Sequence, residues 1–179
     1  MVLMTGKKAL MEMLLAEKTK FIFGNPGTSE SPIMDALEEY PQLEYILVLQ
    51  EGVAIGMADA YARVTGKPSF VNLHIETGLA NAISLINNAD EVGTSIVLTA
   101  GNKDIRELAH GRTDLVAMLQ QFTKWSSEVS HPGALPVMMQ RAFNEAKTPP
   151  IGTSFISFSA NALDDKAEVD IVPSPQTYV

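Results

Sequence analysis

The chain has 179 residues, of which 46% are hydrophobic, enough for one domain with a buried core and too few for two large ones. The formal net charge of −8 and the lack of a Lys/Arg cluster argue against a nucleic-acid-binding surface. The absence of cysteine excludes disulfides, a thiolate nucleophile and a Cys-based zinc site. No apolar run approaches the roughly 20 residues that span a bilayer, so we expect a cytoplasmic protein without a membrane partner.

Helical and strand patterns alternate along the chain. Helices are predicted over residues 6–18, 31–40, 51–64, 78–90, 112–122 and 132–147, and apolar strands over 20–23, 44–49, 68–74, 95–100, 124–130 and 153–159. This alternation predicts an α/β fold, a three-layer α/β/α domain with a central, mostly parallel, doubly wound sheet. We place this domain at residues 1–160. The acidic, Pro-containing segment 161–179 has no periodicity and is predicted to be a linker-like tail towards a missing domain.

Unusual residues follow three of the predicted strands. The strand at 20–23 is followed by Gly24-Asn25-Pro26-Gly27, the strand at 44–49 by Gln50-Glu51, and the third strand ends in His74. In an open parallel sheet the carboxyl ends of the strands meet at one edge, and ligands bind beyond that edge. We therefore expect these residues to converge on one site, although they lie far apart in the sequence.

Glu51 is the most informative single residue, because it directly follows an apolar strand and opens a helix rich in small residues. For an isolated Glu at a helix start, the simpler interpretation is a charge that complements the helix dipole. The small-residue helix 51–64 is typical of one that packs against another subunit or domain, which would bury Glu51. A buried carboxylate has to be paired, hydrogen-bonded or protonated, and a heteroaromatic ring nitrogen would be a suitable partner.

His74 has two interpretations that the residues alone leave open. It is either a core histidine that donates to a carbonyl or a functional residue at the ligand-binding edge. Gly78 and Asn81 belong to the start of the next helix, which Thr77 would cap. Neither a G-x-x-x-x-G-K-[ST] phosphate loop nor a G-x-G-x-x-G turn after the first strand is present, which argues against a generic flavodoxin-like nucleotide binder.

Several stretches of the sequence resemble a known family, namely "FGNPGTSE", "YILVLQEGVAIGMADAYARVTGKPSFVNLH", "GLANA" and "FTKW". In this order and spacing they are similar to the N-terminal, pyrimidine-binding domain of thiamine-diphosphate-dependent enzymes. The likeness is strongest to benzoylformate decarboxylase and related 2-oxo-acid decarboxylases, and it extends from Thr5 to Ser159. The resemblance implies carbon–carbon lyase chemistry on a small 2-oxo acid, with thiamine diphosphate as the cofactor.

The resemblance also implies roles for individual residues. Glu51 matches the glutamate that hydrogen-bonds N1′ of the aminopyrimidine and promotes ylid formation at the thiazolium ring. His74 matches a proton-transfer histidine that acetolactate synthases lack, and Thr28 matches a serine whose hydroxyl meets the substrate carboxylate. The remaining matches are cofactor-binding positions, namely Asn25, Pro26, Gly27, Gly78 and Asn81.

The chain departs from the family pattern in one major respect. Family members carry a second α/β domain that binds the diphosphate through Mg²⁺ with a G-D-G…N motif, and no GDG occurs here. We therefore expect this chain to hold only the pyrimidine half of the cofactor, to contain no metal ligands, and to be inactive alone. The expected partners are a diphosphate-binding domain or subunit that supplies Mg²⁺, and further copies in a homodimer or higher oligomer formed through the 51–64 helix. The alternative is a non-catalytic binding or regulatory module that retains the fold.

Overall fold

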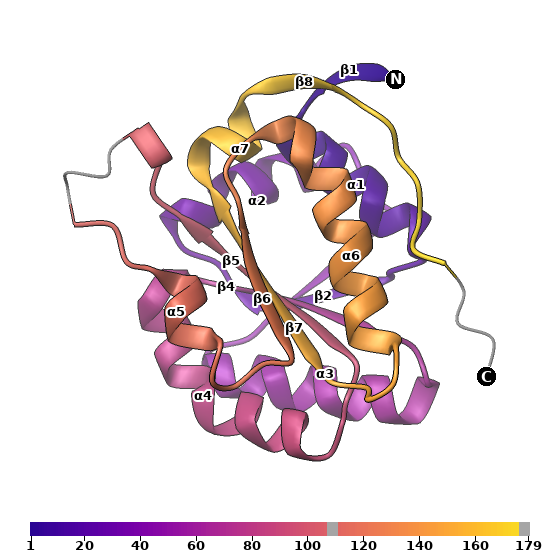
Figure 1. The fold of residues 1–179 in the computed structure, drawn as a ribbon, viewed down its shortest axis with the longest axis vertical. Coiled ribbons are helices and arrows are strands. Elements are labelled where there is room, and N and C mark those ends of the chain that lie inside the picture. Colours follow the sequence, from indigo (N-terminus) through magenta and orange to yellow (C-terminus); the bar gives the residue numbers. More distant parts are fainter. Residues whose placement is uncertain (107–110, 176–179) are drawn as a thin grey trace.

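The computed structural model describes residues 1–106 and 111–175. A six-stranded sheet with the order β3-β2-β4-β5-β7-β6 lies at its centre, and all neighbouring strands are parallel (Figure 1). The strands are β2 (Phe21–Asn25), β3 (Glu44–Leu47), β4 (Ser69–Leu73), β5 (Ile96–Asn102), β6 (Trp125–Val129) and β7 (Thr153–Ser159). The prediction of a doubly wound parallel sheet is confirmed.

Helices cover both faces of this sheet, as Figure 1 shows. One layer contains α1 (Gly6–Ala16), α2 (Ser31–Leu37) and α6 (Leu135–Lys147), and the other contains α3 (Glu51–Thr65), α4 (Ile75–Glu91) and α5 (Leu115–Leu119). Successive strand residues point to opposite layers, so that Ile22 packs with the first set of helices and Phe23 with the second. The domain therefore has the three-layer α/β/α architecture predicted from the sequence.

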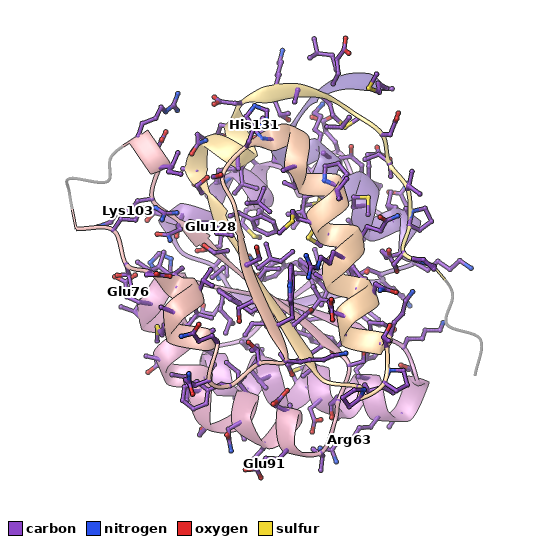
Figure 2. All side chains as sticks on the ribbon, in the orientation of Figure 1. Arg63, Glu76, Glu91, Lys103, Glu128 and His131 are labelled. Atoms are coloured by element: carbon purple, nitrogen blue, oxygen red, sulfur yellow. The ribbon has the colours of Figure 1, made fainter. Side chains whose placement is uncertain are left out.

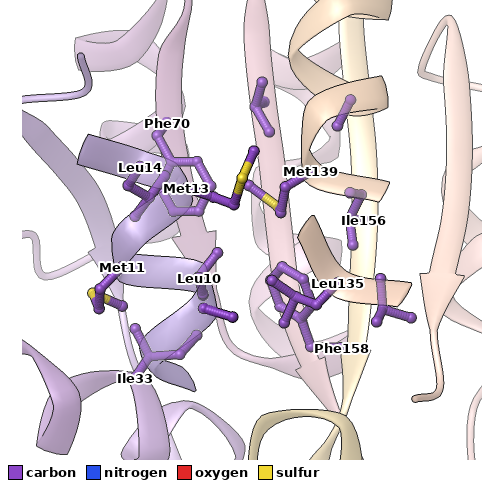
Figure 3. Packing of buried hydrophobic residues seen from close by; sticks show 14 of the residues in the cluster. Leu10, Met11, Met13, Leu14, Ile33, Phe70, Leu135, Met139, Ile156 and Phe158 are labelled. Carbon is purple, nitrogen blue, oxygen red and sulfur yellow. The ribbon is translucent and has the colours of Figure 1, made fainter. Parts of the chain in front are cut away.

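The core between α1, α6 and the sheet consists of large apolar side chains (Figure 3). Leu10, Met13 and Leu14 of α1 recur at the three- and four-residue spacing of one helix face, and all three are fully buried. They meet Met139 of α6 and Phe158 of β7 in one cluster. Burying one such side chain stabilises the fold by about 1.5–3 kcal/mol, so this layer fixes α1 and α6 to the sheet.

The segment after Ser159 differs from the predicted linker-like tail. It forms α7 (Ala160–Asp164) and then β8 (Lys166–Val169), which pairs antiparallel with β1 (Val2–Thr5). The sequence does not predict β8, because this strand is short and half polar and its partner strand lies at the other end of the chain. Residues 160–169 therefore pack on the domain, and the existence of a further domain stays a prediction.

Smaller differences concern the ends of elements. The helix predicted over 112–122 is shorter, because Asp114 caps α5 by accepting from the backbone N of Ala117 at 2.9 Å. Two 3₁₀ turns, η1 (Thr28–Glu30) and η3 (Pro132–Ala134), precede α2 and α6. No helix within the described residues is both long and apolar enough to cross a membrane.

Candidate active site at the carboxyl edge of the sheet

The sheet reverses its direction of winding between β2 and β4. The strand β3 lies on one side of β2, whereas β4 and then β5 follow on the other side. Ligands of doubly wound sheets bind at such a switch point, beyond the carboxyl ends of the strands. Asn25 ends β2 in register with Leu73, the last residue of β4, and His74 follows directly. The topology thus places Asn25 and His74 at the position expected for a ligand.

Glu51 is held at this point by two neutral amides. It is the first residue of α3 and is only 8% exposed. Its Oε1 accepts from Nδ2 of Asn25 at 3.0 Å, and its Oε2 accepts from Nδ2 of Asn81 at 3.1 Å. Gln50 fixes the start of the helix by accepting from the backbone N of Val53 at 3.1 Å. Three predicted site residues are therefore joined by hydrogen bonds, and each carboxylate oxygen keeps a further acceptor site.

The burial of Glu51 does not require a second subunit, contrary to the expectation from the sequence. The small residues Gly52, Ala54 and Ala58 are buried within the chain itself, where α3 packs on the sheet and on α4. Their size lets α3 approach these neighbours closely, which carries Glu51 onto the switch point. The small-residue pattern therefore serves packing inside the domain.

Gly78 of α4 lies between Glu51 and His74. A Cβ atom at this position would lie 3.3 Å from Cγ of Glu51 and 3.5 Å from Cβ of His74. Its backbone N donates to the carbonyl of His74 at 2.7 Å. Gly78 and Asn81, which the sequence assigns to cofactor binding, thus both adjoin Glu51.

A second buried carboxylate, Glu30, was not identified from the sequence. It is fully buried, and its four hydrogen-bond donors are the backbone N of Gly27 (2.9 Å), the backbone N of Gly101 (2.7 Å), Oγ of Ser29 (3.0 Å) and Nδ1 of His74 (2.8 Å). One signal was available, since Glu30 stands three residues after Gly27, the position of the glutamate in a capping box. The contact with Gly101 spans 71 residues and follows from no local pattern.

Glu30 orients the ring of His74. The Nδ1 atom of His74 lies 2.8 Å from Oε2 of Glu30 and 3.1 Å from Oγ of Ser29. Because an ionised carboxylate only accepts hydrogen bonds, this network assigns the ring proton to Nδ1. Nε2 has no partner among the described residues, and the side chain is 27% exposed. Nε2 is therefore the nitrogen that can exchange a proton with a ligand, and the ring does not donate to a carbonyl as a core histidine would.

The loop between β2 and η1 is shaped around this ring. A Cβ atom on Gly27 would lie 2.2 Å from Nδ1 of His74, so the close approach requires glycine. Pro26 is half-buried, and it links Asn25 to Gly27. Thr28 is exposed, and its hydroxyl has no hydrogen-bond partner in the described part of the chain. Thr28 thus directly follows the glycine that approaches His74.

Tyr45 of β3 adds a half-buried phenol near Glu30. Its hydroxyl donates to the carbonyl of Asn72 at 3.3 Å. Burial raises the pKa of Tyr45 above its ordinary value, and the negative charge of Glu30 raises it further. The phenol therefore stays neutral at physiological pH and adds no charge to the site.

Another polar cluster lies at the same edge of the sheet, around Glu128 of β6 (Figure 2). Oε1 of Glu128 accepts from Asn102 at 3.3 Å, from Ser157 at 3.2 Å and from the guanidinium of Arg112. Burial lowers the pKa of Arg112 from its ordinary value. This cluster ties the ends of β5, β6 and β7 together, and its cation is already paired with Glu128.

The polar side chains at the carboxyl edge of the sheet are suited to binding an organic ligand. Across residues 1–106 and 111–175, no group of three or more His, Asp or Glu side chains is placed to hold a metal ion. Glu30 and Glu51 are held by backbone, hydroxyl, amide and imidazole donors instead. The described residues thus offer acceptors for N–H groups and a histidine for proton transfer.

Comparisons with known proteins show which chains are similar to this one in sequence. Benzoylformate decarboxylase of Pseudomonas aeruginosa is 33% identical over 159 residues, which cover 86% of this chain and 29% of that protein. Mitochondrial acetolactate synthase of Schizosaccharomyces pombe is 34% identical over 145 residues, which cover 79% of this chain and 22% of that protein. Identity alone therefore does not separate a decarboxylase from a synthase.

A solved structure shows the same similarity at the level of the fold. The thiamine diphosphate-dependent 4-hydroxybenzoylformate decarboxylase of Rhodococcus jostii RHA1 superposes with a TM-score of 0.84 at 29% identity, covering 93% of this chain and 32% of that one. The chain thus spans less than a third of each of these three proteins. Residues 4–124 match the family described as "Thiamine pyrophosphate enzyme, N-terminal TPP binding domain". The chain therefore belongs to the thiamine pyrophosphate enzymes and represents their N-terminal, TPP-binding domain.

Proposed function

We propose that this chain is the pyrimidine-binding half of a thiamine-diphosphate-dependent 2-oxo-acid decarboxylase or related lyase. The observation that carries the proposal is the buried carboxylate of Glu51, held by the amides of Asn25 and Asn81 at the switch point of the sheet. Thiamine diphosphate, when bound, supplies the carbanion chemistry that protein side chains lack. The residues of this chain bind and orient the cofactor and move protons.

The surroundings of Glu51 fit an aminopyrimidine ring. Beyond the bonds from Asn25 and Asn81, its oxygens keep lone pairs for a ring nitrogen. Gly78 leaves a space beside the carboxylate that a Cβ atom would fill. A carboxylate oxygen accepts hydrogen bonds, so Glu51 can bind a protonated ring nitrogen at this point. We assign it the task of holding a proton at N1′ of the ring.

His74 is the proposed proton-transfer residue. Glu30 keeps the proton on Nδ1, so the lone pair of Nε2 is available to accept a proton from a substrate or product. When Nε2 takes that proton, the imidazolium gains an ion pair with the buried carboxylate 2.8 Å away. This is the arrangement of a general base that is oriented by a carboxylate.

Thr28 is the proposed contact to the substrate carboxylate. Its hydroxyl is exposed and free of partners among the described residues, and Thr28 directly follows Gly27, which approaches His74. A hydroxyl both donates and accepts, so it can bind the carboxylate of a small 2-oxo acid. The assignment is made by similarity to the serine at the matching position in benzoylformate decarboxylases.

The site needs a second component for the rest of the cofactor. The chain spans 29% of the Pseudomonas aeruginosa decarboxylase, and its described residues hold no metal-binding cluster. We therefore propose that a diphosphate-binding domain or subunit brings Mg²⁺ and completes the site. Alone, the chain would bind the cofactor weakly and turn over no substrate.

The outer face of α3 is the proposed contact with that component and with further copies in a homodimer or higher oligomer. Val53, Met57 and Val64 are large apolar side chains exposed on this helix. A largely apolar hollow of about 400 Å³ adjoins them, lined by Phe21, Phe23, Ile46, Met57, Ala60 and Tyr61. Exposed apolar surface of this kind marks protein–protein contacts.

Reconstitution tests the proposed function. The chain is mixed with a protein that carries a G-D-G…N domain, Mg²⁺ and thiamine diphosphate, and CO₂ release is measured with aromatic and aliphatic 2-oxo acids. We expect release with at least one acid, and at least a ~100-fold loss in Glu51→Gln. Glu38→Gln, which alters an exposed carboxylate after α2, is the matched control. If no CO₂ is released with any partner, the proposal is contradicted. If Glu51→Gln keeps full activity, the alternative of a non-catalytic module is favoured.

A further inference from the structure

A second hollow opens at the amino edge of the sheet, opposite the candidate active site. It lies where α1 leads into β2 and α3 leads into β4, and its volume is about 230 Å³. The lining residues come from these two connections and from the aromatic side chains beside them: Glu17, Lys18, Thr19, Lys20, Phe21, Tyr61, Lys67, Pro68 and Ser69. The proposed decarboxylase chemistry uses none of these residues.

Positive charge is concentrated and unpaired at this hollow. Lys18, Lys20 and Lys67 form no ion pair with any described residue. The ammonium group of Lys20 lies 4.8 Å from the ring centroid of Phe21, beside the hollow. Three exposed lysines against one glutamate give this hollow a net positive charge, in a chain whose formal net charge is −8.

The one carboxylate in the lining is already engaged elsewhere. Glu17 accepts from both the backbone N and the hydroxyl of Ser174. The hydroxyl of Ser174 also accepts from Nζ of Lys147 at 2.7 Å, which places a cation within the same network. Glu17 therefore does not serve as the counter-ion of the three lysines.

Two hydroxyls in the lining also lack partners. Oγ1 of Thr19 and Oγ of Ser69 are buried and make no hydrogen bond within the described residues, and Ser69 is 1% exposed as a whole. A buried hydroxyl without a partner carries an uncompensated desolvation cost. Helix ends explain part of the charge, because Lys18 and Lys67 follow the carboxyl ends of α1 and α3. They explain neither Lys20 nor the unpaired hydroxyls.

We propose that this hollow binds a small phosphate-bearing anion, either inorganic phosphate or a small phosphomonoester. A phosphate group carries close to two negative charges at neutral pH and offers several acceptor oxygens. Its charge can therefore be shared by ion pairs with the three ammonium groups. The hydroxyls of Thr19 and Ser69 can hydrogen-bond to it after rotation or through an ordered water. The volume is below the roughly 300 Å³ at which pockets for drug-sized ligands begin, so a nucleotide is too large.

Titration of the isotopically labelled chain with inorganic phosphate, followed by NMR in phosphate-free buffer of low ionic strength, tests this site. We expect saturable shifts of the amides at 18–21, 67 and 69. Lys20→Gln and Lys67→Gln should each weaken binding about 3- to 10-fold, because each removes one of three nearby charges. Lys166→Gln is the matched control, since it removes the same charge from an exposed residue of β8, and it should bind like the unaltered chain.

A parallel titration with glycerol 3-phosphate identifies the form of the phosphate. Tighter binding than inorganic phosphate assigns the site to a phosphomonoester, and equal binding assigns it to the free ion. The proposal is overturned if no shift saturates, or if Lys166→Gln weakens binding as much as Lys20→Gln. Because no thiamine compound takes part, a negative result leaves the proposed decarboxylase function untouched.

Discussion

Nδ1 of His74 lies 2.8 Å from the fully buried carboxylate of Glu30, although 44 positions separate the two residues in the sequence. The contact joins the turn after β2 to the end of β4, which are the two strands that flank the switch point. It also determines which ring nitrogen faces the ligand side. The orientation of the proposed proton-transfer residue therefore depends on a carboxylate that is fully buried.

Glu30→Gln is expected to destabilise the domain and loosen the ring of His74. All four partners of Glu30 donate, so an amide NH₂ group would face two donors in either orientation. We expect a loss of about 2–3 kcal/mol in the free energy of unfolding, measured by urea denaturation. The ¹⁵N shifts of the imidazole should show a smaller fraction of the Nδ1-protonated tautomer.

The exposed Glu38 provides the control for this change. Glu38→Gln should change neither the free energy of unfolding nor the tautomer fraction of His74. If Glu30→Gln unfolds like the unaltered chain and keeps the same tautomer, Glu30 does not orient His74.

Two glycines should respond in opposite ways to alanine. A Cβ atom on Gly27 would lie 2.2 Å from Nδ1 of His74, so Gly27→Ala must displace the ring and should lower the free energy of unfolding by about 1–3 kcal/mol. Gly56 lies inside α3, and its Cβ would meet only Cδ1 of Leu85 at 3.7 Å, so Gly56→Ala should raise that energy by about 0.5–1 kcal/mol. Thermal and urea unfolding measure both. If Gly27→Ala unfolds with the same free energy as the unaltered chain, the loop tolerates a side chain beside His74 and the prediction is wrong.

A second carboxylate next to Glu51 should be costly in a pH-dependent way. Asn81→Asp replaces the exposed amide that donates to the buried carboxylate of Glu51 at 3.1 Å with a like charge, at a cost of about 1–2 kcal/mol near neutral pH. The folded variant then binds protons more tightly than its unfolded chain. Its deficit should therefore shrink as the pH falls towards the unfolded carboxyl pKa of about 4.

The pair of Asn87 and Glu91 has nearly the same geometry, with a hydrogen bond of 3.0 Å, but its carboxylate is exposed, so it provides the control. Asn87→Asp should change the free energy of unfolding by less than about 0.5 kcal/mol, because solvent screens the two charges. A deficit in Asn81→Asp that does not vary with pH would argue against charge repulsion at Glu51.

Alkaline pH should weaken the fold through Tyr45. Burial and the charge of Glu30 raise the pKa of Tyr45 in the folded state. The resulting stabilisation is complete below the unfolded pKa of about 10 and is lost as the pH rises through the folded value. Tyr45→Phe should therefore lose less stability above pH ~10, with urea midpoints measured across this range. Tyr40 should account for part of the remaining slope, because burial and its hydrogen bond to Glu12 raise its pKa to about 12. Identical pH profiles of the variant and the unaltered chain would contradict the prediction.

The sheet and its covering helices are predictable from sequence because each strand is a short apolar run between helical patterns, as at residues 95–100. The ribbon of β1 and β8 is not predictable in this way. Its strands come from opposite ends of the chain, carry exposed and charged residues such as Lys166 and Glu168, and gain their order only by pairing with each other. The helix at 51–64 is correctly predicted, but four of its small residues, Gly52, Ala54, Ala58 and Ala62, pack inside the domain.

The convergence of Asn25 and Glu51 follows from parallel topology, since the carboxyl ends of the strands share one edge. Glu30 does not follow from it, because the direction of a side chain in a 3₁₀ turn and the position of Gly101 emerge only from the folded chain. The roles of Glu51, His74 and Thr28 rest on resemblance to the family and stay predictions.

Exchange of the C2 proton of thiamine diphosphate, measured by NMR in the assembly with a diphosphate-binding partner and Mg²⁺, tests the role of Glu51 most directly. We predict that Glu51→Gln slows this exchange to the rate of the free cofactor, while Glu38→Gln exchanges like the unaltered assembly. Exchange at the unaltered rate in Glu51→Gln, with cofactor binding intact, would contradict the claim that this buried carboxylate activates the aminopyrimidine.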